Sequence, residues 1–361
     1  MLKRAGFVAY VVVSSLLLLL LIETGAHYYL KSTGLSTPFL FQKTRNKIRA
    51  LGDNRELYGT FDPHIGYAHG ANEAGVRELS PEFTWLDGFV VYSNRTANFE
   101  RPVVLALGGS TTDGVIYGHS WPEELSRLLK DNKLPGTVIN GGVGGYSTNQ
   151  ELLKLMRDGL EFSPNLVVSY SGINDRGTYS KLPYPMVHNY QRDVIDMLQG
   201  KTSPVFPSTI ELLKRITGSF GGNEFSYTYG TKSHRTLAEQ YRRNLELMDA
   251  MAESQGSKFR AFIQPFAFYR SRHSVNVSPD KKGPDYIEAV RTLYDEITKL
   301  PQSRPYVHDF TGILENDDNV YKEDGVHLTR NGDKAVARAV FNSIKSVMVS
   351  GAGESRSPPA Q

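Results

Sequence analysis

The stretch VVLALGGSTTDG, Val103 to Gly114, decides how the chain is interpreted. Five apolar residues run without interruption into glycine, serine and threonine. A short apolar run that ends in small turn residues is typical of a buried β-strand followed by a tight turn. Ser110 stands in that turn, either as an ordinary turn residue or as a nucleophile held at the end of a strand. The rest of the chain has to supply the partners that a nucleophilic serine needs.

Strand and helix patterns alternate from residue 101 onward. Besides PVVLALG, apolar runs predict strands in GTVIN, PNLVVSYSG, FRAFIQPF and PYVHDF. Amphipathic spacing predicts helices in SWPEELSRLLKDN, STNQELLKLMRDGLEF, 233–255, 284–299 and TRNGDKAVARAVFNSIKSVMV. This alternation predicts an α/β fold with a parallel sheet and helices on both of its faces.

The chain divides into four predicted segments. Residues 1–30 form an apolar N-terminal helix, and residues 31–100 form a juxtamembrane linker and an irregular, aromatic-rich extension. Residues 101–348 form the main domain, with an insertion at about 177–230 that is rich in proline, glycine and aromatic residues. We interpret this insertion as a cover over the site, with a helix near 208–216. The small and polar residues 349–361 are expected to be disordered.

The N-terminal residues predict a membrane anchor. Lys3 and Arg4 precede an apolar run from about Ala5 to Ile22, and about 18 residues is near the lower limit for crossing a bilayer. The basic residues favour a cytoplasmic N-terminus. We therefore expect a single-pass protein of a bacterial inner membrane, with its catalytic domain outside the cytoplasm. A signal peptide cleaved after Thr24–Ala26, which would release a secreted protein, is the alternative.

Bulk composition excludes several classes of function. The net charge of +3 on 361 residues argues against a nucleic-acid-binding protein, which would carry a basic surface. The absence of cysteine excludes disulfides, thiolate metal sites and a cysteine nucleophile. No spacing of histidines and carboxylates is typical of a metal site, and no phosphate or dinucleotide loop is present. We therefore expect neither a metal nor a cofactor.

Residues with useful chemistry follow four of the predicted strands. GGS follows the first strand, NGGVGGYST the second, SGIND the third and EDGVHLT the fifth. Parallel sheets bind ligands beyond the carboxyl ends of their strands. The four segments are thus expected to converge at one edge of the sheet, where they supply a serine, glycine amides, an asparagine, an aspartate and a histidine.

This inventory fits acyl transfer. A serine hydroxyl is a poor nucleophile until a base takes its proton, and His327 can be that base. Asp324, three residues earlier, can hold the imidazole in the required tautomer and stabilise its charged form. The oxyanion of a tetrahedral intermediate needs hydrogen-bond donors. The Asn174 side chain, a glycine N–H and the N–H of Ser110 itself are the candidates.

The order of the four segments resembles that of the SGNH (GDSL-type) hydrolase superfamily, over roughly residues 101 to 346. The resemblance implies a three-layer α/β/α sandwich of the flavodoxin-like kind around a five-stranded parallel sheet. It makes Ser110 the nucleophile, Asp324 and His327 its triad partners, and Asn174 an oxyanion donor. GGST replaces the GDS of the family's name, but the missing aspartate is not a triad member.

The glycine of the oxyanion hole has two candidates. Gly145, just before Tyr-Ser-Thr, matches the family pattern best, and Gly142 is the other choice. Among the remaining histidines, His308 lies inside the fifth strand pattern and is expected to be a packed residue. Three more histidines stand near aromatic residues and glycines and could line the pocket: His64, His69 and His119.

The function that follows is that of a serine esterase, which hydrolyses carboxylic esters through an acyl-enzyme. Its exported location and aromatic-rich loops favour removal of acetyl groups from extracytoplasmic carbohydrate, because aromatic side chains stack on sugar faces. Three alternatives remain: an O-acyltransferase that acts on a surface polysaccharide, a lysophospholipase or thioesterase, and an inactive polysaccharide-binding assembly protein.

Overall fold

The computed structural model describes residues 2–32, 60–62, 64–69, 83–86, 88–92, 99–113, 118–176, 207–216, 236–270, 277–315 and 317–351. The chain forms two compact units. The smaller unit comprises residues 1–53 and 192–233, and the larger one comprises residues 54–191 and 234–361.

The larger unit is built around a seven-stranded sheet in the order β3-β4-β6-β5-β7-β8-β9. Its last five strands are mutually parallel: β6 (Thr137–Asn140), β5 (Val103–Gly108), β7 (Leu166–Ser171), β8 (Lys258–Ile263) and β9 (Val307–Asp309). This part of the sheet has the flavodoxin-like order 2-1-3-4-5 and confirms the predicted parallel sheet. Every residue of β5, β6 and β7 is buried, as expected for strands covered on both faces.

The sheet has two strands more than the five that the sequence predicted. They come from the extension that was expected to be irregular: β3 (Phe83–Leu86) and β4 (Phe89–Tyr92). Leu86 pairs with Phe89 and Gly88 has a φ of +82°, so the chain reverses within two residues. β4 then pairs antiparallel with the edge strand β6. Strands β1 (Thr60–Asp62) and β2 (Gly66–Ala68) form a separate antiparallel pair.

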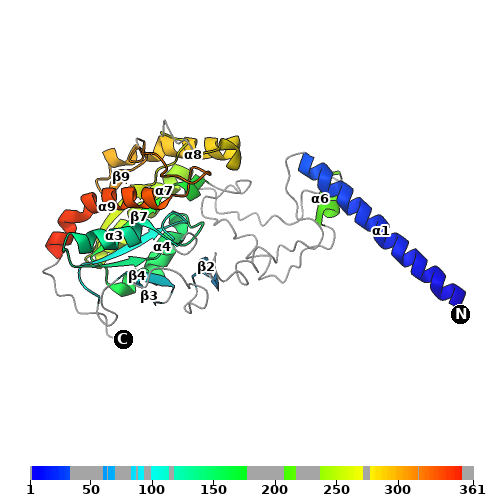
Figure 1. Ribbon diagram of the computed structural model, residues 1–361, viewed down its shortest axis with the longest axis horizontal. Coiled ribbons are helices and arrows are strands. Elements are labelled where there is room, and N and C mark those ends of the chain that lie inside the picture. The colour runs from blue at the N-terminus through cyan, green and yellow to red at the C-terminus, as the bar shows by residue number, and fades with distance from the viewer. Residues whose placement is uncertain are drawn as a thin grey trace, which may run out of the picture. The chain divides into compact units, whose positions relative to one another are not determined.

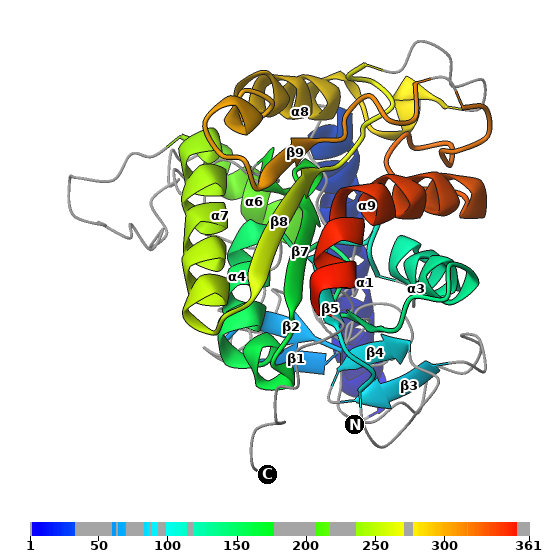
Figure 2. The same cartoon turned by 90° about the vertical axis from the view of Figure 1, so that its left-hand side faces the viewer.

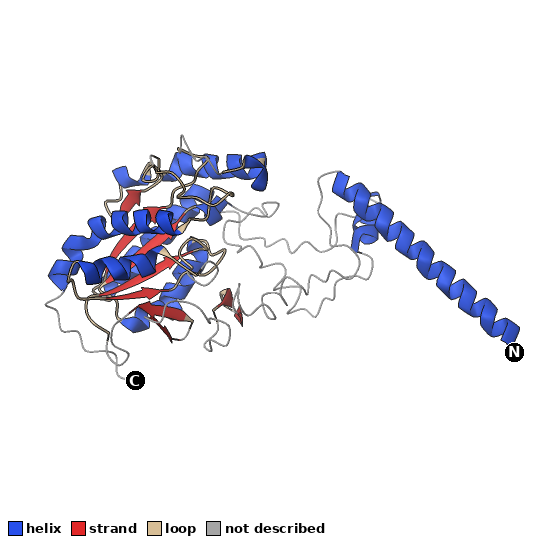
Figure 3. Cartoon of the chain, viewed as in Figure 1, coloured by secondary structure: helices blue, strands red, loops and turns tan. Residues whose placement is uncertain are grey.

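Helices cover both faces of the sheet and complete three layers (Figures 2 and 3). Alternate residues of each central strand point to opposite faces. One face packs on α3 (Trp121–Asp131) and α9 (Arg330–Gly351). The other packs on α4 (Thr148–Arg157), α7 (Leu237–Ser254) and α8 (Pro284–Ile297). Short 3₁₀ helices lie at η1 (Gly159–Phe162), η2 (Ile173–Arg176), η3 (Pro279–Lys281) and η4 (Leu300–Gln302).

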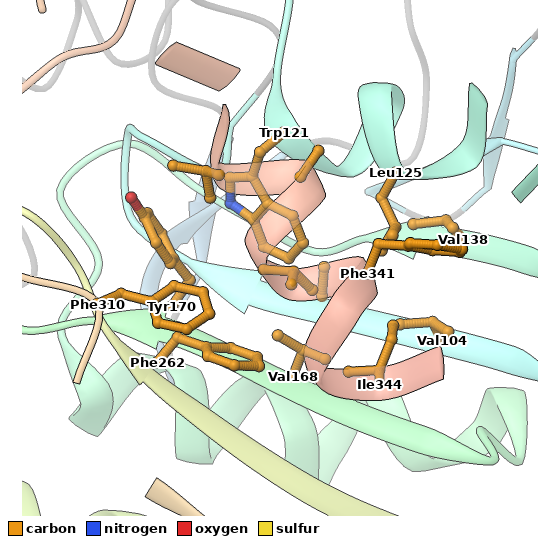
Figure 4. Close-up of a cluster of buried hydrophobic side chains, with 14 of the residues drawn as sticks. Val104, Trp121, Leu125, Val138, Val168, Tyr170, Phe262, Phe310, Phe341 and Ile344 are labelled. Carbon is orange, nitrogen blue, oxygen red and sulfur yellow. The ribbon is translucent and has the colours of Figure 1, made fainter. Parts of the chain in front are cut away.

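The core beneath α3 and α9 is anchored by Trp121, which is fully buried beside Tyr170 of β7 (Figure 4). The same cluster includes Leu125 of α3, Phe341 of α9, Val104 of β5 and Val138 of β6. Truncating a buried leucine of this kind to alanine costs about 2–5 kcal/mol of folding free energy. This packing fixes the β5 strand and therefore the turn that follows it.

The smaller unit contains two described helices, α1 (Leu2–Ser32) and α6 (Pro207–Ile216). Within α1, Tyr10–Leu30 is long and apolar enough to span a membrane, with a mean hydropathy of 1.7. Helix α6 lies where the sequence predicted a helix in the insertion. The remaining insertion, residues 177–206 and 217–230, lies outside the described residues. Residues 33–59 of the predicted linker and extension, which span 31–100, also lie outside them.

Candidate active site

The turn after β5 presents Ser110. The N–H groups of Thr112 and Asp113 both donate to the carbonyl oxygen of Gly109 at 3.0 Å, which closes a tight turn. A Cβ atom at Gly108 would overlap the Thr112 side chain, so this position requires glycine. Ser110 is partly exposed at the outer side of this turn. The chain after Asp113 does not continue directly into α3, which begins at Trp121.

A continuous hydrogen-bonded chain joins Ser110, His327 and Asp324. Ser110 Oγ lies 2.8 Å from His327 Nε2, and His327 Nδ1 lies 2.6 Å from Asp324 Oδ2. The other carboxylate oxygen of Asp324 accepts the backbone N–H groups of Val326 and His327, at 3.1 and 3.0 Å. Because one carboxylate thus fixes both the loop and the ring, the imidazole is held with one nitrogen facing Ser110.

The charge of Asp324 is supported from two sides. Burial alone would raise the pKa of its carboxyl, but the hydrogen bonds and charge of His327 and the ammonium of Lys282 hold that pKa well below its usual range. Lys282 Nζ lies 3.1 Å from Asp324 Oδ2. It also lies 5.2 Å from the ring centre of Tyr286, whose ring is stacked by Arg176 at 3.8 Å. Lys282 could not be predicted from the sequence, because its contact with Asp324 depends on tertiary packing.

Asn174 lies beside the serine-bearing turn. Its Nδ2 donates to the carbonyl oxygen of Tyr146 at 2.9 Å. A Cβ atom at Gly109 would stand 2.5 Å from the same Nδ2 and 3.0 Å from the Tyr146 oxygen. Only glycine at position 109 therefore lets the Asn174 amide approach the residue that precedes Ser110.

The loop NGGVGGYST contains both glycine candidates for the oxyanion hole, Gly142 and Gly145. The N–H of Gly142 donates to Asn140 Oδ1 at 2.9 Å, so that donor is already engaged. Gly142 is also buried, whereas Gly145 is partly exposed and has a φ of +82°. The N–H of Gly144 donates to Asp113 Oδ2 at 2.9 Å, which ties this loop to the turn that carries Ser110. The two candidates thus differ in exposure and in backbone conformation.

Two buried carboxyl groups, those of Asp175 and Glu151, hold segments near the site in place through hydrogen bonds. Asp175 accepts hydrogen bonds from the N–H and the hydroxyl of Thr148, where α4 begins, so the segment after β7 is fixed to the segment after β6. Glu151 accepts the hydroxyls of Ser169 and Ser171. Burial raises the pKa of Asp175 and of Glu151 to about 7. Asp175 thus has a structural role at the N-terminus of α4.

The other histidines occupy different positions. His69 Nε2 lies 3.2 Å from Asp113 Oδ2, although His69 comes from the N-terminal extension. His119 Nδ1 contacts the buried carboxylate of Asp333. His308 stacks on Phe262 with ring centres 5.1 Å apart, consistent with a packed residue. The sequence neighbours of His64, His69 and His119 suggested that these residues line the pocket. In the structure, His69 and His119 each face a buried aspartate, and His64 is exposed.

The arrangement as a whole can perform acyl transfer. A serine hydroxyl within hydrogen-bond distance of an imidazole, which is itself oriented by a carboxylate, is the constellation that activates an oxygen nucleophile. The Asn174 amide beside the serine-bearing turn adds a donor for developing negative charge. All four predicted segments contribute to this one site.

A comparison with protein families agrees with this chemistry. The model of the GDSL-like lipase/acylhydrolase family matches residues 106–335, which include all four segments. No curated protein sequence matches the chain. Solved structures with a similar fold include a putative acylhydrolase from Bacteroides fragilis, at 16% identity and a TM-score of 0.40, which covers 71% of this chain and 91% of that one.

Two further solved structures are similar. The lipase/acylhydrolase from Enterococcus faecalis has 16% identity and a TM-score of 0.40, with 68% of this chain and 95% of that one covered. A catalytic mutant of an acetylxylan esterase from Geobacillus stearothermophilus has 13% identity and a TM-score of 0.42, with 69% and 96% covered. Because the family model matches more than half of the chain, this protein belongs to the GDSL-like lipase/acylhydrolase family and is a carboxylic ester hydrolase.

Proposed function

We propose that the protein is a membrane-anchored serine esterase that removes acetyl groups from carbohydrate outside the cytoplasm, with Ser110 as its nucleophile. The observation that supports this most is the hydrogen-bonded chain from Ser110 through His327 to Asp324, at 2.8 and 2.6 Å. These distances lie within the range at which a base takes the proton of an attacking hydroxyl.

In the first half of the reaction, Ser110 Oγ attacks the ester carbonyl while His327 Nε2 takes its proton. Asp324 stabilises the resulting imidazolium through Nδ1. The carbonyl oxygen becomes an oxyanion, which the side chain of Asn174 and the N–H groups of Gly145 and Ser110 stabilise. His327 then protonates the alkoxy oxygen, the alcohol leaves, and the acyl group remains on Ser110.

In the second half, water replaces the alcohol. His327 takes a proton from the water as its oxygen attacks the acyl-enzyme, and the same donors hold the second oxyanion. Collapse of this intermediate returns the proton to Ser110 Oγ and releases the carboxylic acid. An acceptor hydroxyl of a sugar in place of water would give acyl transfer, so the two activities share every residue up to this step.

The location and substrate are proposed from the N-terminal helix. An apolar helix preceded by Lys3 and Arg4 supports an anchor with the catalytic unit outside the cytoplasm. Esters met on that side are carried by carbohydrates and lipids. The aromatic-rich segments of the chain favour carbohydrate, because aromatic rings stack on sugar faces, and an acetyl group is the small acyl group that we propose for it.

The test uses full-length protein in detergent micelles. We expect p-nitrophenyl acetate to be hydrolysed faster than the butyrate and octanoate esters, and acetate to be released from acetylated polysaccharide. Ser110→Ala should lower turnover at least about 1,000-fold and abolish labelling by a fluorophosphonate probe. A preference for octanoate would overturn the acetyl assignment, and unchanged turnover in Ser110→Ala would overturn the nucleophile. Acetylation of an added oligosaccharide in excess of hydrolysis would favour the acyltransferase.

A further inference from the structure

Helix α1 has two surfaces of different character. The described side chains between Phe7 and Ile22 are exposed. From Glu23 onward, one face is buried, because Glu23, Ala26 and Leu30 stand at positions i, i+3 and i+7. A helix that is apolar all round fits lipid, whereas a single buried stripe indicates a protein partner. The surface of α1 changes from exposed to partly buried at Glu23, directly after the apolar run that ends at Ile22.

The partner of this stripe is α6, from the insertion in the catalytic domain (Figure 1). The Glu23 carboxylate accepts the backbone N–H groups of Ser208 and Thr209, each at 2.8 Å, and the hydroxyl of Thr209 at 2.7 Å. The first N–H groups of a helix have no partner within the helix, and its N-terminus carries partial positive charge. One side chain of α1 therefore caps α6, and both Glu23 and Ser208 are fully buried.

The position of this contact along α1 defines its depth in a membrane. The apolar run from about Ala5 to Ile22 is about 27 Å long as a helix, close to the thickness of the hydrocarbon core. Glu23 would then lie at the outer boundary. Tyr28 and Tyr29, both exposed, follow within about 10 Å, and tyrosine is enriched in the headgroup layer. A helix that docks between Glu23 and Leu30 thus lies in this layer.

Helix α6 presents apolar side chains that the described protein does not cover. Ile210, Leu213 and Ile216 recur at intervals of three residues and are 37%, 52% and 71% exposed. Their spacing places them on one side of the helix. Helix α6 packs on α1 where α1 leaves the hydrocarbon core. The outer leaflet of the bilayer is therefore the environment that covers these apolar side chains.

We propose that α1 is retained as an uncleaved anchor and that α6, docked on it through Glu23, is a second membrane-contacting helix in the outer interface. Cleavage after Thr24–Ala26 would remove two of the three buried residues of this contact. The catalytic unit is then tethered to the membrane by two segments of the chain, the N-terminal helix and the insertion. This inference rests on the proposed membrane location and is independent of the ester chemistry.

The experiment exploits the absence of cysteine from the chain. Three single-cysteine variants of the full-length protein carry an environment-sensitive fluorophore in liposomes: Leu213→Cys on α6, Leu18→Cys in the apolar run and Met156→Cys on α4. Met156 is 56% exposed in the catalytic unit and is the matched control. We expect nitroxide lipids to quench the probes at positions 213 and 18, and aqueous iodide to quench the probe at position 156.

A second substitution tests the cap. Glu23→Leu removes both carboxylate oxygens and with them the three hydrogen bonds to Ser208 and Thr209. Lipid quenching at position 213 should therefore fall at least about twofold, while quenching at position 18 and ester turnover stay unchanged. Intact mass should show that residues 2–32 are retained. An iodide-quenched probe at position 213 with a lipid-quenched probe at position 18 would overturn the docking of α6 and leave the anchor in place. A mature chain that begins after Ala26 would overturn both, without bearing on the esterase activity.

Discussion

Lys282 Nζ lies 3.1 Å from Asp324 Oδ2, the same carboxylate oxygen that lies 2.6 Å from His327 Nδ1. One oxygen therefore shares its negative charge between an imidazole and an ammonium. The ammonium thus helps His327 to keep the Asp324 carboxylate in its charged form, with a pKa well below the usual range despite burial. Lys282 is thus a positioning residue that adjusts the electrostatics of the site without contacting Ser110.

We expect Lys282→Met to lower kcat by about two- to fivefold, because Asp324 loses one of the partners that hold its carboxylate charged and in position. The loss should be small, since Lys282 and Asp324 are both partly exposed and their interaction is screened. The charge of Lys322, which also interacts with Asp324, remains in the variant. Lys281→Met is the matched control, because Lys281 pairs with the exposed Glu323 instead. An equal loss of kcat in both variants, or no loss in either, would contradict this role.

Asp324→Asn tests the orientation of His327. Asparagine keeps a carbonyl oxygen for the N–H groups of Val326 and His327, so the loop should fold as before. Its amide nitrogen, however, faces His327 Nδ1 as a donor and favours the tautomer that cannot accept the proton of Ser110. We expect kcat to fall about 10³–10⁴-fold with an unchanged melting temperature. Retention of a tenth of the activity would show that Asp324 is dispensable for orienting the ring.

The site was predictable because its chemistry lies at the ends of buried strands. The apolar runs of β5, β6 and β7 mark these strands clearly, and parallel strands bring their carboxyl ends to one edge. The sequence alone therefore predicts that four side chains lie near one another: Ser110, Asn174, Asp324 and His327. Asp324 and His327 are only three residues apart, so their contact depends on the local geometry of a single loop.

Three features were not predicted: the β3–β4 hairpin, the contact of Lys282 with Asp324 and the contact of Glu23 with Thr209. The hairpin of β3 and β4 had a local signal, because Asp-Gly between FTWL and FVVY is a frequent two-residue turn, but the surrounding glycines and aromatics favoured an irregular interpretation. Lys282 has no local signal at all, since a lysine in SPDKKG is typical of a solvated loop. The contact of Glu23 with Thr209 spans 186 residues, and neither helix alone indicates it.

Gly109→Ala should disable the site through Asn174. The new Cβ would stand 2.5 Å from Asn174 Nδ2, so the amide must move away from the serine-bearing turn. Loss of one oxyanion donor costs about 10²–10³-fold in kcat, and we expect this reduction with little change in KM. The double variant with Asn174→Ala should be no slower than the slower single variant. Multiplicative losses would instead indicate that Gly109 acts independently of the amide.

Glu151 makes the stability of the catalytic unit depend on pH. Burial raises the pKa of its carboxyl to about 7, from an ordinary value of 4.5. Between these values the folded protein keeps a proton that the unfolded chain has released, so the free energy of unfolding falls as pH rises and levels off above about pH 7. The slope from one such group is at most about 1.4 kcal/mol per pH unit. Asp175, raised from 3.8 to about 7, acts in the same direction.

Glu151→Gln should remove the Glu151 part of this slope. Glutamine resembles the protonated carboxyl, because it can accept from one serine hydroxyl and donate to the other, at Ser169 and Ser171. We expect urea unfolding, followed by tryptophan fluorescence, to show the variant close to the wild type at pH 5 and more stable at pH 8. The control, Glu161→Gln, changes an exposed glutamate of η1 and should leave the slope intact. If the Glu151 variant is instead less stable than the wild type at pH 8, the carboxylate form is favoured in the folded protein. In that case Ser169 and Ser171 stabilise its charge by more than burial destabilises it.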